Sequence, residues 1–189
     1  MSVATAVPTR RATLDDLLRT PEKAELIGGR IVKYMATGFR PNLVAGRIFR
    51  KLADYTDTPG RGYAFTDSMG FAVPELSSGR ESFSPDAAFY SGPPPARPMR
   101  FVEAAPDFAV EVRSENDYGP SAERDMAKKR LDYFEAGTQV VWDVDPESRT
   151  IRMYRADAPL QPIVFGAGED AHAEPAAPGW KVSVDWLMA

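Results

Sequence analysis

The segment of residues 106–145 constrains the fold more than any other part of the chain. It begins with "PDFAVEV", an apolar run with strand spacing, and continues through "GPSAERDMAKKRLDYFEAGT", which has helical spacing and Gly137 at the position of a C-terminal stop. It ends with "QVVWDVD", a continuous apolar run typical of a buried strand. The sequence therefore predicts a strand-helix-strand crossover over residues 107–145 within a mixed sheet.

Shorter elements surround this crossover. Residues 13–21 form a short helix that opens on a threonine N-cap and ends at a proline, and "ELIGGRIV" at residues 25–32 is a tight hairpin. Residues 40–56 are expected to form an amphipathic helix, residues 61–90 an antiparallel meander, and residues 149–154 a further strand. The order predicts an α/β or α+β domain in which helices flank a mixed sheet.

The length of 189 residues suits a single domain. Within it, residues 1–12 are expected to be a flexible N-terminus, and residues 156–179, rich in Ala, Pro and Gly, a loop-rich segment. The following "WKVSVDWL" fits an edge strand or a short helix. Because no apolar run approaches the ~20 residues of a membrane span and the start lacks a signal-peptide core, the sequence predicts a cytoplasmic protein without a membrane contact.

Residue usage excludes several kinds of chemistry. The chain has no cysteine, which excludes disulfides, thiolate zinc sites and cysteine nucleophiles. The single histidine, His172, lies in a Pro/Ala/Gly-rich stretch, so a catalytic triad or a histidine metal site would depend on that one loop residue. Any catalysis must therefore come from carboxylates together with Lys, Arg, Ser or Tyr.

The charge balance restricts how the protein can contact nucleic acid. A net charge of −4 and a pI near 5.1 have the wrong sign for general electrostatic binding to DNA. A local basic patch would be needed. The outer face of the helix at residues 40–56 is the candidate, either as a solvated face or as a phosphate-binding stripe, and carries Arg40, Arg47, Arg50 and Lys51.

Two carboxylates stand out at strand positions. Glu111 lies in the middle of "PDFAVEVRS" and shares a strand face with Arg113, which could form a structural salt bridge with it. Asp86, in "SPDAAFY", lies on an earlier strand that can run beside the first, whereas Asp107 shares its strand with Glu111 and is a poorer partner. Asp86 and Glu111, with the carbonyl of Val112, would make an oxygen site suited to Mg²⁺ or Mn²⁺.

Five ordered segments resemble a known family. "ELIGGRIV", "PDAAFY", "PDFAVEVRS", "KKRLDYFEAGTQVVWDVDP" and "RTIRMYR" resemble, in order and spacing, the restriction-endonuclease-like family labelled Uma two, a branch of the PD-(D/E)xK nuclease superfamily. The resemblance covers residues 13–155. It implies a four-stranded mixed core sheet flanked by helices, with Asp86 as the leading aspartate and Glu111 as the acidic member of the (D/E)xK motif.

The resemblance also implies the remaining site residues. Arg113 stands where that motif has lysine, and arginine does not replace lysine neutrally. The family lysine is instead expected on the following helix at Lys129, four residues before Tyr133. Glu25 is expected as an additional acidic residue near the metal, with a solvated strand-edge glutamate as the alternative. Asn42 stands where relatives are expected to have histidine, which leaves no role assigned to it.

Helical geometry gives an independent test of the lysine. At 100° per residue, Lys128 falls on the polar side, whereas Lys129 falls at the apolar rim beside Tyr133. Arg130 falls inside the apolar arc, from which it would snorkel outward or contact carboxylates.

Three functions remain open at this level. The main hypothesis is a Mg²⁺- or Mn²⁺-dependent DNA endonuclease. A homodimer would let two such sites act on the two DNA strands. The second is a noncatalytic nucleic-acid-binding or scaffolding module that retains the fold. The third, a carboxylate hydrolase of a small substrate, would need a deep pocket instead of an open basic groove.

Overall fold

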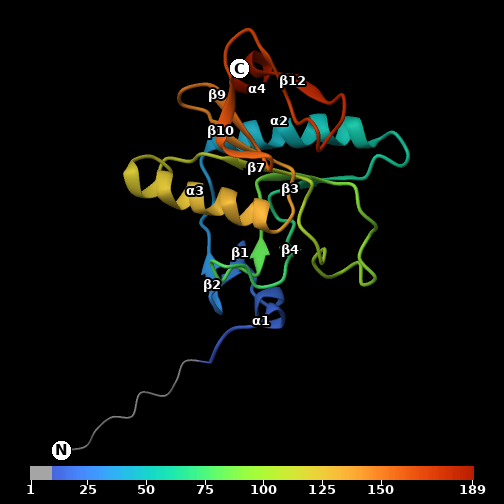
Figure 1. Ribbon diagram of the computed structural model, residues 1–189, viewed down its shortest axis with the longest axis vertical. Helices are drawn as coiled ribbons and strands as arrows, with labels where there is room; N and C mark the ends of the chain where they lie inside the picture. Colours follow the sequence, from blue (N-terminus) through green and yellow to red (C-terminus); the bar gives the residue numbers. More distant parts are fainter. Residues whose placement is uncertain (1–9) are drawn as a thin grey trace, which may run out of the picture.

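A six-stranded mixed sheet forms the centre of the computed structural model, which describes residues 10–189 (Figure 1). Its strand order is β10-β9-β8-β7-β6-β3. The parallel pair, β7 (Phe108–Val112) and β8 (Val140–Asp145), is joined by α3 (Pro120–Glu135), and the other neighbours are antiparallel. The predicted crossover and mixed sheet are therefore confirmed. The remaining strands of the sheet are β3 (Tyr63–Thr66), β6 (Ala87–Tyr90), β9 (Thr150–Arg155) and β10 (Ala158–Phe165).

Local sequence explains the ends of α3. Pro120 occupies the first turn, where its missing N–H costs nothing. Gly137 follows the C-cap with a φ of 105°, a left-handed conformation that a residue with a Cβ adopts only with strain. The helix therefore stops at the residue that the sequence indicates, and the chain turns directly into β8.

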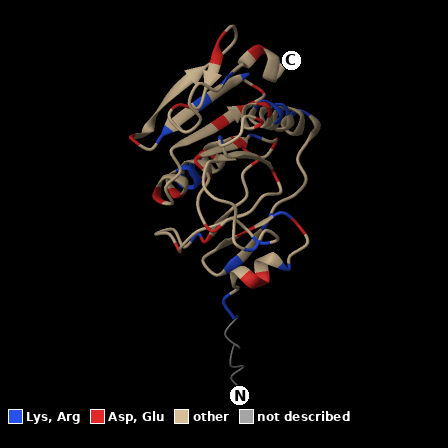
Figure 2. Ribbon diagram, turned by 90° about the vertical axis from the view of Figure 1, so that its right-hand side faces the viewer, with Lys and Arg blue, Asp and Glu red and all other residues tan. Residues whose placement is uncertain are grey.

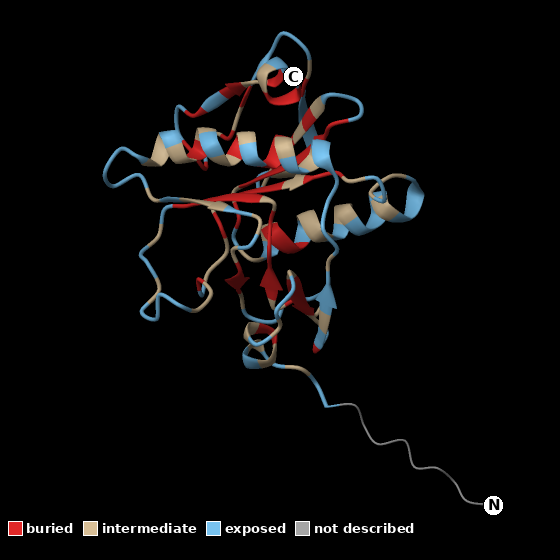
Figure 3. Cartoon of the chain, turned by 180° about the vertical axis from the view of Figure 1, so that it is seen from behind, coloured by how far each residue is buried: buried red, intermediate tan, exposed pale blue. Residues whose placement is uncertain are grey.

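Helices cover both faces of the sheet (Figure 1). On one face, α2 (Phe39–Thr56) and the C-terminal segment with α4 (Val184–Met188) enclose a core; on the other, α3 packs with the segment between β3 and β7. Alternate residues of β7 accordingly serve different cores, with Phe108 and Val110 toward α2 and Ala109 toward α3. Figure 3 shows that buried residues concentrate in the strands and on the inner sides of the helices.

The hairpin of β1 (Ala24–Ile27) and β2 (Arg30–Lys33) forms as predicted. Gly28 and Gly29 both have positive φ, as a two-residue turn of the primed type requires. The hairpin follows α1 (Leu14–Leu18), whose N-cap Thr13 forms a capping box with Asp16. The expected flexibility of residues 1–12 concerns in part residues 1–9, which lie outside the described part of the chain.

The predicted meander over residues 61–90 is wrong. β3 pairs directly with β6, while β4 (Phe71–Ala72) and β5 (Ser82–Phe83) form a separate hairpin between them in sequence. This second hairpin docks on β1 instead of joining the sheet, since the Leu26 N–H donates to Ser82 Oγ at 2.8 Å. The β1–β2 hairpin therefore lies near the start of β6, where Lys23 contacts Asp86.

The predicted loop-rich segment at residues 156–179 is also wrong. It contains β10, an edge strand on β9, and β11 (Asp170–His172), which pairs with β12 (Lys181–Ser183). Pro159 and Pro162 give β10 a loop-like composition, but proline is tolerated on an edge strand, and the pairing with β9 shifts register between Ala158 and Ile163. The segment "WKVSVDWL" becomes both a strand and a helix, β12 followed by α4. None of the helices formed by residues 10–189 has the length and apolar character that crossing a bilayer requires.

Candidate active site

Four side chains predicted from the sequence meet where β6 and β7 diverge. Asp86 immediately precedes β6, Glu111 lies near the end of β7, Lys129 projects from α3, and Glu25 comes from β1. The site therefore draws on three regions far apart in sequence: the N-terminal hairpin, the sheet and the crossover helix.

Asp86 is fixed by the backbone of β7. Its N–H donates to the Val110 carbonyl at 2.9 Å, and its Oδ2 accepts from the Val112 N–H at 2.8 Å. The N–H and C=O of one strand residue point to the same side, so the Val112 carbonyl faces the edge on which Asp86 lies. The other carboxylate oxygen, Oδ1, pairs with Lys23 Nζ at 2.8 Å.

Lys129 bridges the two glutamates. Its Nζ lies 2.8 Å from Glu111 Oε1 and 3.1 Å from Glu25 Oε1. The Tyr133 hydroxyl, one helical turn further along α3, donates to the same Glu111 oxygen at 2.7 Å. Lys128 instead has a side chain that is 75% exposed. The helical phase expected from the sequence thus matches the structure.

Glu25 is fully buried, so the alternative of a solvated strand-edge glutamate is wrong. Its Oε1 accepts from the Ser84 N–H at 3.0 Å and contacts Lys129; its Oε2 accepts from the Tyr34 hydroxyl at 2.7 Å and from Arg80. Protein donors therefore surround this carboxylate, which suits it to holding Lys129 in place.

These contacts perturb the ionisation of the site. Burial, with Asp86 and Glu25 nearby, raises the pKa of Glu111 above its ordinary value in spite of Lys129. Burial opposes the charged form of Lys129, but Glu111 and Glu25 outweigh it and raise the pKa of this lysine. Burial and the adjacent Glu111 likewise raise the pKa of Tyr133. Lys129 is therefore an ammonium and Tyr133 a neutral phenol at neutral pH.

The donor chemistry of the site fits a hard divalent cation. Asp86 and Glu111 supply carboxylate oxygens and Val112 a carbonyl, the ligand types that Mg²⁺ and Mn²⁺ prefer. Burial is the main cause of the raised pKa of Glu111, and Asp86 and Glu25 add to it, so a bound cation would favour the ionised carboxylate. Among residues 10–189, no three or more His, Cys, Asp or Glu side chains group so as to hold a metal. The candidate set accordingly depends on two carboxylates and a main-chain carbonyl.

Arg113 lies outside this constellation. Its guanidinium makes a bidentate pair with Asp143, at 2.7 and 2.8 Å, and also contacts Glu123. The expected salt bridge of Arg113 thus forms with Asp143 on β8 and not with Glu111. Arg130 contacts the same aspartate at 3.1 Å and lies over the Tyr154 ring. Of the two expectations for Arg130, contact with a carboxylate is therefore the one that the structure shows.

Three residues of the predicted basic face of α2 contact the C-terminal segment, while Arg50 remains exposed. Arg40 donates to the Met188 carbonyl at 2.9 Å, Arg47 donates to the Leu187 carbonyl at 3.1 Å, and Lys51 lies over the Trp186 ring. These groups hold the C-terminal segment. Figure 2 places the basic part of α2 in the half of the molecule near the C-terminus, and the sheet separates α2 from the α3 side, where the carboxylates lie.

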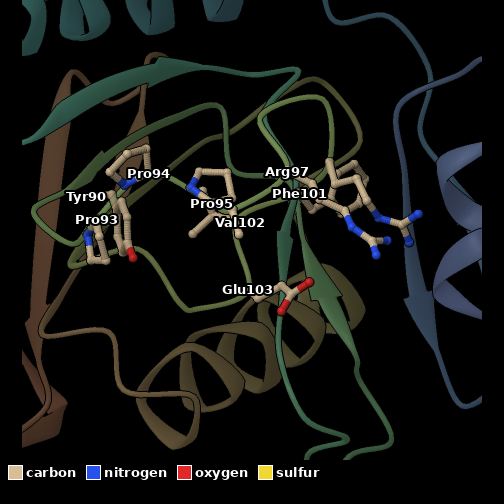
Figure 4. Close-up of a pocket in the computed structure, with 10 residues that line it drawn as sticks. Tyr90, Pro93, Pro94, Pro95, Arg97, Phe101, Val102 and Glu103 are labelled. Atoms are coloured by element: carbon tan, nitrogen blue, oxygen red, sulfur yellow. The ribbon is translucent and has the colours of Figure 1, made fainter.

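A hollow of about 480 Å³ lies under the proline-rich segment that follows β6 (Figure 4). Its wall includes Tyr90, Pro95, Arg97 and Glu103, and none of the site carboxylates. Tyr90 is at the end of β6 opposite Asp86. The carboxylate site is therefore not part of this hollow.

Sequence reasoning missed several groups that complete the site. Lys23 and Tyr34 come from the same hairpin as Glu25, and Arg80 links Glu25 to Asp132 on α3. Lys23 immediately precedes β1 and lies two residues before Glu25, which is a signal for Lys23 because residues two apart on an extended chain share a face. Arg80 has no such signal, since it lies in the loop between β4 and β5.

The sheet with its parallel β7-α3-β8 unit, with carboxylates on the strands and a lysine on the crossover helix, is that of a restriction-endonuclease-like protein. The family is shown by a match over residues 12–185 to the Uma2 model, described as "Putative restriction endonuclease". This chain belongs to that family.

A solved structure shares the fold. It is a "putative nuclease belonging to DUF820" from Anabaena variabilis, with 21% sequence identity and a TM-score of 0.72. The match covers 93% of this chain and 97% of that chain, so the common fold extends over nearly the whole molecule. None of the curated proteins matches the chain.

The buried Glu25 gives a pH-dependent prediction. Although burial opposes its charge, Lys129 and Arg80 lower its pKa from an ordinary 4.5 to about 2. Its ionised form therefore contributes stability that is present above pH 4.5 and is lost as the pH falls toward 2. We expect Glu25→Gln to reduce the free energy of unfolding most at neutral pH, with a gap to the wild type that narrows below pH 4.5.

Urea unfolding at a series of pH values measures this gap. The exposed Glu115→Gln is the control and should show no such narrowing. A gap that stays constant down to pH 2 would mean that Glu25 carries no depressed pKa.

Proposed function

We propose that this protein is a Mg²⁺- or Mn²⁺-dependent endonuclease that hydrolyses phosphodiester bonds of DNA. The observation that carries the proposal is the convergence of Asp86, Glu111 and Lys129, in which Val112 N–H donates to Asp86 and Lys129 contacts Glu111. Membership of a restriction-endonuclease-like family supports the reaction class.

The residues divide into ligands and groups that act on the phosphate. Asp86, Glu111 and the Val112 carbonyl would hold the metal ion, which supplies Lewis acidity and a bound water of lowered pKa. The ammonium of Lys129 stabilises the negative charge that develops on the phosphate. Tyr133 and Glu25 are positioning residues: Tyr133 orients Glu111, and Glu25 orients Lys129.

The test of the metal site is Asp86→Asn. An amide keeps the shape of the side chain but removes the charge, so we expect Mn²⁺ affinity to fall by about tenfold or more and DNA cleavage to fall with it. Isothermal calorimetry measures Mn²⁺ binding, and relaxation of supercoiled plasmid with Mg²⁺ or with EDTA measures cleavage.

Asp107→Asn is the matched control. Asp107 belongs to the other proline-aspartate pair and caps Ser91, accepting from its N–H. We expect this variant to bind Mn²⁺ as the wild type does. If the wild type binds no Mn²⁺, or if Asp86→Asn binds it equally well, the proposed metal site is wrong.

A noncatalytic nucleic-acid-binding or scaffolding module is the second candidate. It is favoured by Arg113, because this arginine stands at the lysine position of the motif and is committed to Asp143 and Glu123. Under this alternative, purified protein would bind DNA and leave plasmid intact at every Mg²⁺ and Mn²⁺ concentration. A homodimer remains part of the endonuclease proposal, and analytical ultracentrifugation tests it.

A further inference from the structure

Lys23 lies beside the proposed metal aspartate and has no part in the mechanism above. Its Nζ is 2.8 Å from Asp86 Oδ1 and 3.9 Å from Asp67 Oδ2. The Lys23 side chain is 22% exposed and that of Asp86 is 23% exposed, so both members of the pair are partly accessible to solvent. A cation in this position can reach both Asp86 and a phosphate that approaches from outside.

The backbone fixes where Lys23 can move. Its carbonyl accepts from the Tyr34 N–H at 2.9 Å, which extends the β1–β2 ladder by one residue pair. Lys23 and Glu25 lie two apart along this strand and therefore project from one face of the hairpin toward the site. The backbone is anchored, and the flexible four-carbon stem is free to redirect the ammonium.

Asp86 cannot pair closely with Lys23 and bind a divalent cation through the same oxygen at the same time. Oδ2 accepts from the Val112 N–H, and Oδ1 is the oxygen paired with Lys23. A divalent cation at Asp86 and Glu111 would repel an adjacent ammonium and compete with it for Oδ1. The released ammonium would remain within a side-chain length of the site, where the substrate carries negative charge.

From this geometry we propose that Lys23 is a phosphate ligand that is held on Asp86 in the metal-free protein and turns to the DNA backbone when the metal binds. This role rests on the proposed endonuclease function and deepens it. Lys23 thereby couples metal loading to substrate binding. It also supplies a local cation for DNA on the side of the sheet where the carboxylates lie, which α2 does not.

Lys23→Gln tests both halves of this proposal. Because glutamine leaves Asp86 without a competing cation, we expect Mn²⁺ and Ca²⁺ to bind about three- to tenfold more tightly, as measured by calorimetry. Fluorescence anisotropy with a labelled DNA duplex should then show about fivefold weaker binding in Ca²⁺, with the slope of log affinity against log salt smaller by about one. In EDTA, where Lys23 is held on Asp86, the variant should lose less DNA affinity than it loses in Ca²⁺.

Lys33→Gln is the matched control, since Lys33 lies on the same hairpin and pairs with Glu22 outside the site. It should not change metal affinity. A gel of the anisotropy samples verifies that the duplex is intact. If the wild type binds metal and cleaves DNA but Lys23→Gln changes neither metal affinity nor Ca²⁺-dependent DNA binding, the role of Lys23 is wrong and the endonuclease stands. If the wild type binds no metal, both proposals are wrong.

Discussion

Lys129→Met is expected to lower the rate of Mg²⁺-dependent DNA cleavage by about 10²- to 10³-fold. The ammonium is 2.8 Å from Glu111 and 3.1 Å from Glu25, and its raised pKa keeps it charged throughout the neutral range. Methionine retains the unbranched stem and removes the charge. The loss should therefore appear in the rate constant of the cleavage step, measured as single-turnover cleavage of a labelled duplex with the enzyme in excess.

A second readout separates this electrostatic role from loss of the fold. Removing the cation from Glu111 leaves more negative charge for a metal, so Lys129→Met should bind Mn²⁺ at least as tightly as the wild type. Lys128→Met is the control, because its side chain is 75% exposed and lies 3.9 Å from Asp125. Equal cleavage by Lys129→Met and Lys128→Met would remove Lys129 from the mechanism.

Local pattern and the family resemblance together predicted most of the residues that meet here. The spacing of apolar residues placed Glu111 in the middle of a strand and Lys129 at the inner rim of a helix. Both depend only on periods of 2 and 3.6 residues. The resemblance added Lys129 and Glu25 and gave Asp86 its place in the motif, and the structure brings these three residues to the same place. What these predictions share is that each residue lies in or next to a regular element whose direction the sequence determines.

Long-range docking accounts for what the sequence did not predict. Arg80 reaches Glu25 and Asp132 because the β4–β5 hairpin packs on β1, a contact that no periodicity encodes. Lys23 becomes part of the site through the same arrangement. The basic face of α2 was left open as a solvated face or a phosphate-binding stripe, because the sequence could not show that Arg40 and Arg47 would donate to carbonyls of the C-terminal segment. Exposure is a property of the assembled fold and not of a single amphipathic helix.

Asp143 is a charged residue within a buried apolar strand, and its ion pairs were not predicted from the sequence. It lies within "VVWDVD", a segment buried throughout, and its side chain is 1% exposed. It balances two cations, Arg113 from the end of β7 and Arg130 from α3. Asp143→Ala should therefore leave guanidinium charge buried without its partner and reduce the free energy of unfolding by about 3–5 kcal/mol, measured by urea denaturation.

Asp125→Ala provides the comparison on α3. Its carboxylate is 72% exposed and lies 3.9 Å from Lys128, so its loss should change the free energy of unfolding by about 1 kcal/mol or less. A similarly small change for Asp143→Ala would show that the arginines find solvent or Glu123 instead.

The Asp143 network also connects β8 to α3, so it can affect the position of Lys129 as well as stability. Arg130 is the residue after Lys129, so its tie to β8 helps to fix how α3 rotates against the sheet. Replacing the whole network by apolar residues, as in Arg113→Met, Asp143→Leu and Arg130→Met together, should recover most of the stability lost in Asp143→Ala. If the network also orients Lys129, this stable variant should still cleave DNA more slowly than the wild type. A stable triple variant with unchanged cleavage would restrict the network to holding the fold, and would place the orientation of Lys129 on Glu25 and Glu111 alone.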